Sequence, residues 1–245
     1  MNQVMSKNIF KHIFSITLIV IMFSSCKKYY MDSGTHDKVY EGSVMDYIKE
    51  RKDIFDSLYK VIQLADMEGT LNRDGVTFFA PGDASIRKTI FELNDYLHSI
   101  GRDTVYTLDQ VDPSVWKEYL SMYIYNNTYT LRDIPQLDTL NMNIFPGQGF
   151  VSVGNQNMNI GVIYNHVATN DGQVIEYAGY RQLYISYLLD VSNTGGFGSM
   201  INAPVATSDI LTNNGVIHAL EYRRHAFGFI ASRFINSAYS KGIKY

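Results

Sequence analysis

Hydrophobic and polar residues recur along the chain with two different periods. Residues 54–65 carry apolar side chains every three or four positions, which predicts an amphipathic helix with one buried face. Residues 116–123 repeat that spacing. The predicted buried positions are Ile54, Leu58, Val61, Ile62, Ala65, Trp116, Tyr119, Leu120 and Tyr123. The predicted helix starts, read from capping residues, are Ser43 with Asp46, Asp53 with Asp56, and Asp112 with Pro113.

The period changes to two in the second half of the chain. Residues 158–164 and 183–189 alternate apolar and other side chains, which predicts two half-buried strands. The Asn-Asp-Gly sequence at residues 170–172 is typical of a turn between strands. Residues 76–80 predict a short buried strand that Pro81 ends. Because helices come first and strands follow, we expect an α+β fold.

The first 25 residues have the order of a secretory signal. An apolar run over residues 13–23 follows two lysines and precedes the small residues Ser24 and Ser25. That run is shorter than the about 20 residues that a membrane-spanning helix needs. Cys26, the only cysteine, comes next, and residues 23–26 resemble a bacterial lipobox, in which the cysteine is acylated. We therefore predict a lipoprotein signal peptide over residues 1–25.

Residues 26–40 are then the lipidated cysteine and a flexible polar tether, so the membrane is a predicted partner through the lipid anchor. The alternatives are an ordinary signal peptide with an incidental cysteine, or a buried start to the fold. The predicted location is the cell envelope at the outer membrane, with the side it faces left open.

Charge and composition narrow the function classes. Lys+Arg number 21 against Asp+Glu 24, so we do not expect the basic surface that nucleic acid requires. The single cysteine excludes a disulfide scaffold. The histidines lack metal-ligand spacing, and no nucleophile elbow or phosphate loop occurs in the sequence. We predict no metal, no cofactor and no catalytic residue, with a carboxylate-based glycan hydrolase as the less favoured alternative.

Three segments, in this order and spacing, resemble the signatures of the fasciclin (FAS1) domain. They are residues 77–86, residues 119–134, and residues 209–220 with the core Asn-Gly-Val-Ile-His. The resemblance spans residues 41–229 and leaves 230–245 as a C-terminal tail, either docked as a helix or loose. It implies a FAS1-like fold, with helices packed on a wedge of mainly antiparallel sheet. The matching motif residues are Thr77, Phe79, Pro81, Asp83, Tyr123, Asn214, Gly215 and His218.

Physical reasoning assigns those motifs structural roles. Asn214 and Gly215 suit the positive-φ positions of a tight turn. His218 lies in an apolar strand, so we interpret it as a hydrogen-bonded core histidine rather than a ligand or a base. Pro81 with Asp83 predicts a corner from a strand to an Asp-capped helix. None of these roles needs a substrate.

Candidate contact residues come from the tyrosine-rich segments, because tyrosine rings stack on sugars or on partner side chains while the hydroxyl finds a polar group. The family's Tyr-His pair, associated with adhesion, is here Tyr123 followed by Ile124, so its histidine is absent. Residues 178–206 exceed the usual family spacing, which predicts an insertion that carries function. The candidate binding residues are Tyr180, Tyr184, Tyr187 and Phe197.

These observations favour a non-catalytic binding or adhesion module on the envelope of a Gram-negative, Bacteroidota-type cell. Its expected ligand is a polysaccharide or a neighbouring outer-membrane protein. The alternative is a structural accessory subunit of an outer-membrane complex, with residues 178–206 as its interface.

Overall fold

A computed structural model describes residues 39–189 and 196–244. The predictions for the signal peptide, for Cys26 and for nearly all of the tether lie outside the described residues. The described residues belong to one compact unit, Asp37–Tyr245, which contains both helices and strands. Its α-helices are α2 (Val44–Glu50), α3 (Lys52–Leu64), α4 (Glu68–Leu71), α5 (Asp83–Ser99), α6 (Pro113–Leu120) and α7 (Ala231–Lys241). Its 3-10 turns are η1 (Leu108–Gln110), η2 (Ser121–Tyr123), η3 (Phe197–Ser199) and η4 (Tyr222–Arg224).

Local sequence explains two of the helix starts. Ser43 caps α2 in a capping box with Asp46, and Asp112 accepts the N–H of Ser114 at the start of α6. The start of α3 differs from the prediction, because Arg51 rather than Asp53 is its N-cap.

The buried face of α3 also differs by one residue. Helix α3 has a kink at Phe55, whose φ and ψ are −130° and 18°. Because this kink shifts the phase of the first turn, Phe55 is buried and Ile54 is exposed.

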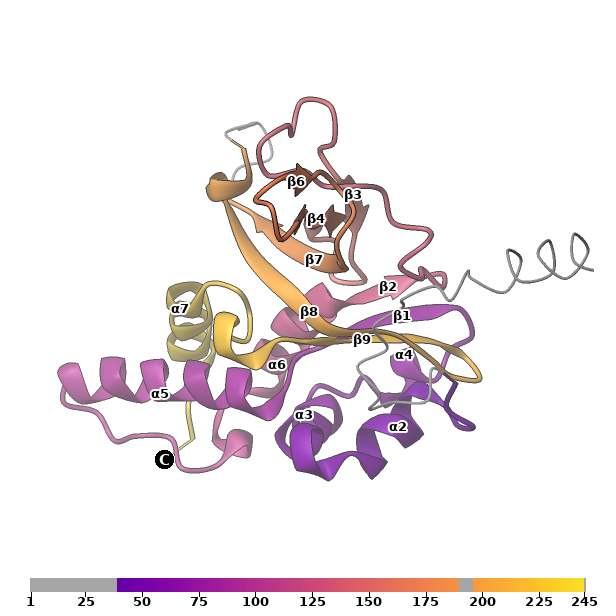
Figure 1. The fold of residues 1–245 in the computed structure, drawn as a ribbon. Coiled ribbons are helices and arrows are strands. Elements are labelled where there is room, and N and C mark those ends of the chain that lie inside the picture. The colour runs from indigo at the N-terminus through magenta and orange to yellow at the C-terminus, as the bar shows by residue number, and fades with distance from the viewer. Residues whose placement is uncertain (1–38, 190–195, 245) are drawn as a thin grey trace, which may run out of the picture. The chain divides into compact units, whose positions relative to one another are not determined.

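A seven-stranded sheet has the order β2-β1-β9-β8-β7-β4-β3 (Figure 1). Of the pairs of neighbouring strands in this sheet of described residues, β1 and β9 run parallel and the others run antiparallel. The α+β class with a mainly antiparallel sheet is confirmed. The strands of the sheet are β1 (Val76–Ala80), β2 (Ile124–Asn126), β3 (Gln148–Val151), β4 (Asn157–Tyr164), β7 (Arg181–Leu188), β8 (Met200–Leu211) and β9 (Gly215–Leu220). A separate ribbon pairs β5 (Val167–Ala168) with β6 (Val174–Ile175).

The structure corrects the interpretation of residues 178–206. Strand β7 and the first half of β8 lie in this stretch, and they pair with each other from Tyr184 opposite Pro204 to Leu188 opposite Met200. Most of the described residues in this stretch therefore belong to interior strands of the sheet and not to a loop.

In Figure 1, helices α2 to α6 lie below β1, β8 and β9, and the β5–β6 ribbon lies above these strands, near β4. The tail takes the docked alternative, because α7 packs on α5 and α6. The ring of Trp116 in α6 lies 5.3 Å from that of Phe234 in α7 and 5.7 Å from that of Phe227. Aromatic packing of this kind fixes the helices to one another.

Candidate functional site

The motif residue His218 is buried in β9 and bonded at both ring nitrogens. Its Nδ1 accepts the N–H of Asp209 at 3.2 Å, and its Nε2–H donates to the carbonyl of Tyr129 at 2.9 Å. Burial lowers the pKa of His218, so the ring is neutral. The ring of Phe79 packs against it, with centroids 4.9 Å apart. This arrangement ties the chain after β2 to the sheet and leaves no ring nitrogen for a ligand.

Thr77 fastens the same segment from β1. Its hydroxyl donates to the carbonyl of Asn127 and accepts the N–H of Tyr129, both at 2.8 Å. The side chain of Thr77 therefore fixes the turn that follows β2.

Gly215 has a different role from the predicted one. Neither Asn214 nor Gly215 has a positive φ. A Cβ on Gly215 would lie 2.1 Å from the carbonyl oxygen of Val76, so glycine is required by the close parallel approach of β1 and β9. The side chain of Asn214 caps three backbone groups, the carbonyls of Leu71 and Arg73 and the N–H of Val44.

Asp83 also caps a helix other than its own. Gly82 is the N-cap of α5 and Asp83 is its first residue, directly after the Pro81 corner. The Asp83 carboxylate accepts the N–H groups of Ser57 at 2.9 Å and Leu58 at 3.1 Å. These groups follow the kink in α3, so Asp83 caps the second part of α3 and fastens it to the start of α5.

Tyr123 is fully buried between the rings of Phe227 and Phe229. Its hydroxyl accepts the N–H of Gly228 and donates to Nε2 of His225, both at 2.7 Å. A tyrosine–histidine pair therefore exists here, formed with a distant histidine and closed to solvent.

The four predicted binding residues lie in different environments. Tyr180, just before β7, is 69% exposed. Tyr184 is half-buried, and its ring makes an edge contact with that of Phe197, with centroids 5.6 Å apart. Tyr187 is only 5% exposed, since it packs on Phe229 and its hydroxyl bonds to Arg233. Tyr187 is therefore a core residue, and its prediction as a contact residue was wrong.

Large apolar side chains, Tyr180 among them, are also exposed on two segments, one before β3 and the other after β4. We call this set of side chains the loop platform. Its side chains are 50–85% exposed. The loop platform consists of Leu140 and Ile144 in the loop 138–147 together with Val174, Ile175 and Tyr180 in residues 165–180.

Asp138 joins the two segments of the loop platform. Its carboxylate accepts the N–H groups of Leu140 and Asn141 and the hydroxyl of Tyr177, the last at 2.7 Å. The ring of Tyr177 also contacts that of Phe145 across the segments. These hydrogen bonds, led by that of Tyr177, lower the pKa of Asp138 to about 2, so the carboxylate is ionised at neutral pH.

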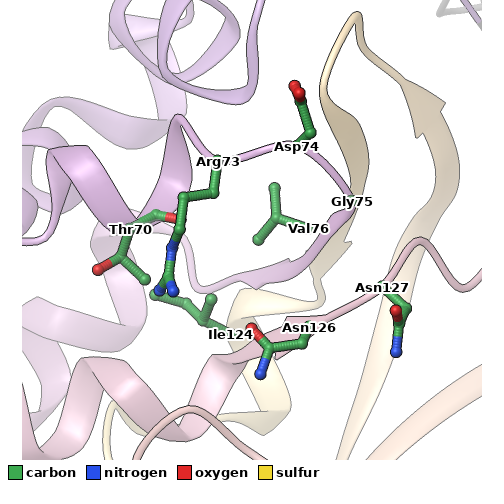
Figure 2. A pocket seen from close by; sticks show the side chains of 8 residues that line it. All are labelled: Thr70, Arg73, Asp74, Gly75, Val76, Ile124, Asn126 and Asn127. Atoms are coloured by element: carbon green, nitrogen blue, oxygen red, sulfur yellow. The ribbon is translucent and has the colours of Figure 1, made fainter.

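Two polar hollows lie on either side of β2. One, of about 290 Å³, is shown in Figure 2: the Arg73 side chain extends toward Ile124 and Asn126, while Asp74 points away. The other, of about 330 Å³, lies between β2 and β3. Each hollow is lined by one carboxylate, Asp74 or Asp133, and so neither presents the pair that glycoside hydrolysis requires.

Across the described residues there is no group of three or more His, Cys, Asp or Glu side chains suited to hold a metal ion. No helix within residues 39–189 and 196–244 has the length and apolar character to cross a bilayer.

A family model for the fasciclin domain matches residues 53–222. The chain belongs to the fasciclin family. One solved structure that it resembles is a FAS1 domain pair from the insect cell adhesion molecule fasciclin I, with 16% identity and a TM-score of 0.46 over 74% of this chain. The chain spans 50% of the length of that structure. No curated protein sequence matches the chain significantly.

This fasciclin domain has a candidate contact surface that sequence reasoning largely missed. Tyr180 was predicted because a single aromatic residue is already a candidate contact residue. The aliphatic members, such as Leu140 and Val174, lie in short segments without a hydrophobic period, and only the fold shows that they are exposed. The Asn-Asp-Gly turn at residues 170–172 was the one local signal, since it marked the β5–β6 ribbon.

Proposed function

We propose that this fasciclin domain is a non-catalytic, lipid-anchored adhesion module that binds a neighbouring envelope protein through the loop platform. Fasciclin domains are known from adhesion and cell-surface proteins, and this role fits the family match over residues 53–222. The observation that carries the proposal is the exposure of five large apolar side chains on two segments that Asp138 holds together.

The chemistry of the loop platform favours a protein over a polysaccharide. Four of its five side chains are aliphatic, and only Tyr180 offers a ring for stacking on a sugar. Aliphatic side chains gain free energy when a partner removes them from water, by about 1.5–3 kcal/mol for a fully buried Leu, Ile or Val.

The β5–β6 ribbon supports the same conclusion. Val167 and Ile175 pair on one face of this ribbon and Val174 projects from the other, and all three are exposed. A lone two-stranded ribbon is marginally stable in water. A partner that covers either face would therefore stabilise it.

Site-specific photo-crosslinking in cells tests the loop platform. A benzophenone amino acid at position 180 should capture a defined envelope protein, and the same group at Tyr106, beyond α5 and more exposed than Tyr180, is the control. Adding Leu140→Ser and Val174→Ser should abolish capture at 180. Capture that is equal at the two positions, or unaffected by the substitutions, would refute the proposal.

A separate experiment tests the anchor. Cys26→Ser should remove labelling by a palmitate analogue and release the protein from membranes, since two or more acyl chains hold a protein on a bilayer stably.

A further inference from the structure

The two edge strands of the sheet, β2 and β3, lie on either side of the 330 Å³ hollow. Just beyond the end of β3, the N–H of Val153 donates to the carbonyl of Ile124 in β2 at 2.8 Å. Beyond that contact the described residues form no backbone hydrogen bond between the two strands. The hollow is therefore a groove between two sheet edges.

The pairing of β3 shows which of its backbone groups face the groove. The N–H of Ser152 donates to the carbonyl of Gln156, so Ser152 and Gln156 form a hydrogen-bonded pair one step beyond the last β3–β4 pair, Val151 with Asn157. Because such pairs alternate along an antiparallel ladder, Phe150 bonds to β4, while Gly149 and Val151 direct their N–H and C=O groups away from it. Those four groups have no hydrogen-bond partner among the described residues.

Strand β2 presents the same kind of edge from the other wall. The carbonyl of Ile124 points toward Val153, so the N–H and C=O of Asn126, two residues further on, point the same way. They too lack a backbone partner in the described chain. Unpaired groups thus recur at every second residue, which is the repeat of an extended strand.

Aromatic rings form the floor of the groove. The Phe150 side chain is turned inward, with its ring centroid 5.0 Å from that of Tyr129 and 6.3 Å from that of Tyr125. These ring contacts keep the backbones of β2 and β3 apart by the width of the side chains between them, so the two strands cannot pair with each other directly.

Apart from their short length, β2 with three residues and β3 with four, the two edges lack the features that normally prevent strand addition. Edge strands are usually protected by lysine, proline, inward-pointing charges or bulges. The residues of β2 and β3 include none of these side chains, and Val151 is 60% exposed. Asp133 is the one charged residue among those lining the groove, which favours a neutral or basic occupant.

We infer that this groove binds an extended, neutral or basic peptide segment of another protein, which adds as a strand along β3. The peptide backbone pairs with the free groups of Gly149 and Val151, and alternate side chains face the rings of the floor. This site is separate from the loop platform, so each can fail without the other.

A random decapeptide display library, selected on the whole protein, tests this inference. Val151→Pro removes one outward N–H and leaves the β3–β4 bonds intact, because proline is tolerated at such an edge position. Val151→Thr keeps the N–H and is the matched control. Selected peptides should bind the proline variant at least about tenfold more weakly, and the threonine variant about as well as the wild type.

Hydrogen exchange of the backbone amides gives a second measurement. Addition of a selected peptide should slow exchange at Gly149 or Val151 and leave Gly172, in the β5–β6 turn, unchanged. The amide of Ile160 in β4 reports that the proline variant is folded. Failure to enrich any peptide, equal binding to the proline variant, or edge protection that rises with protein concentration without peptide, as for a second copy, would overturn the inference.

Discussion

Acid should destabilise this domain through a buried histidine. His225 is 2% exposed, and burial, with a smaller contribution from the charge of Lys88, lowers its pKa to about 3. Its Nε2 accepts the hydroxyl of Tyr123, a bond that a protonated ring cannot accept. The folded state therefore excludes a proton that the unfolded chain binds below its ordinary pKa of about 6.5.

The sign and size follow from proton linkage. Below about pH 6.5 the unfolded state holds more protons than the folded state, so the free energy of unfolding falls as pH falls, until about pH 3. One such proton is worth about 1.4 kcal/mol per pH unit, so His225 costs about 2 kcal/mol between pH 7 and pH 5. His218, whose pKa burial also lowers, acts in the same direction.

Urea unfolding at pH 7 and pH 5 measures this loss. His225→Phe removes the titrating group and keeps a ring beside Phe229, so its loss between the two pH values should be smaller than that of the wild type by about 2 kcal/mol. His98→Gln alters an exposed histidine and should leave the loss unchanged. If His225→Phe loses as much stability as the wild type, the histidine is not the group responsible.

Two further predictions concern packing and the loop platform. Gly215→Ala should destabilise the domain by about 2–3 kcal/mol in urea unfolding, because the added Cβ would collide with β1. Gly69→Ala, which has open space around it, should not destabilise the domain. Equal effects of the two substitutions would exclude the close approach as the reason for glycine at position 215. Tyr177→Phe removes one hydrogen bond to Asp138 and should speed amide exchange at Leu140 by about fivefold, which corresponds to a loss of about 1 kcal/mol in local stability. Unchanged exchange at Leu140 would show that this hydrogen bond does not hold the loop.

The fold was largely predictable because many of its determinants are local. The Ser43 and Asp112 caps and the alternation in β4 and β7 depend on neighbours within a few residues, and the structure has them as predicted, except that β7 ends at Leu188 and Leu189 is exposed. The errors arose where a residue's role depends on a distant segment.

The motif glycine and aspartate show this dependence. Glycine is required at position 215 by the carbonyl of Val76 in the neighbouring parallel strand β1. Asp83 caps backbone N–H groups 25 and 26 residues earlier in the chain. Tyr187 shares the alternating face of Leu183 and Ile185, and this face is buried, with Phe229 and Arg233 of α7 against Tyr187. The spacing of β7 therefore predicted the buried face correctly, and the choice of Tyr187 as a contact residue disagreed with that spacing.

The positions of the motifs bear on where binding resides. Tyr123, the tyrosine of the central signature, is wholly buried with its hydroxyl committed to His225 and Gly228, so it cannot touch a partner while the domain stays folded. His218 and Thr77 are equally committed. The loop platform lies between the second and third signatures, and the groove combines β3, from the same stretch, with residues 125–133 of the second signature. The signatures thus account for the scaffold, and recognition is expected to change with residues 138–180 while the scaffold is kept.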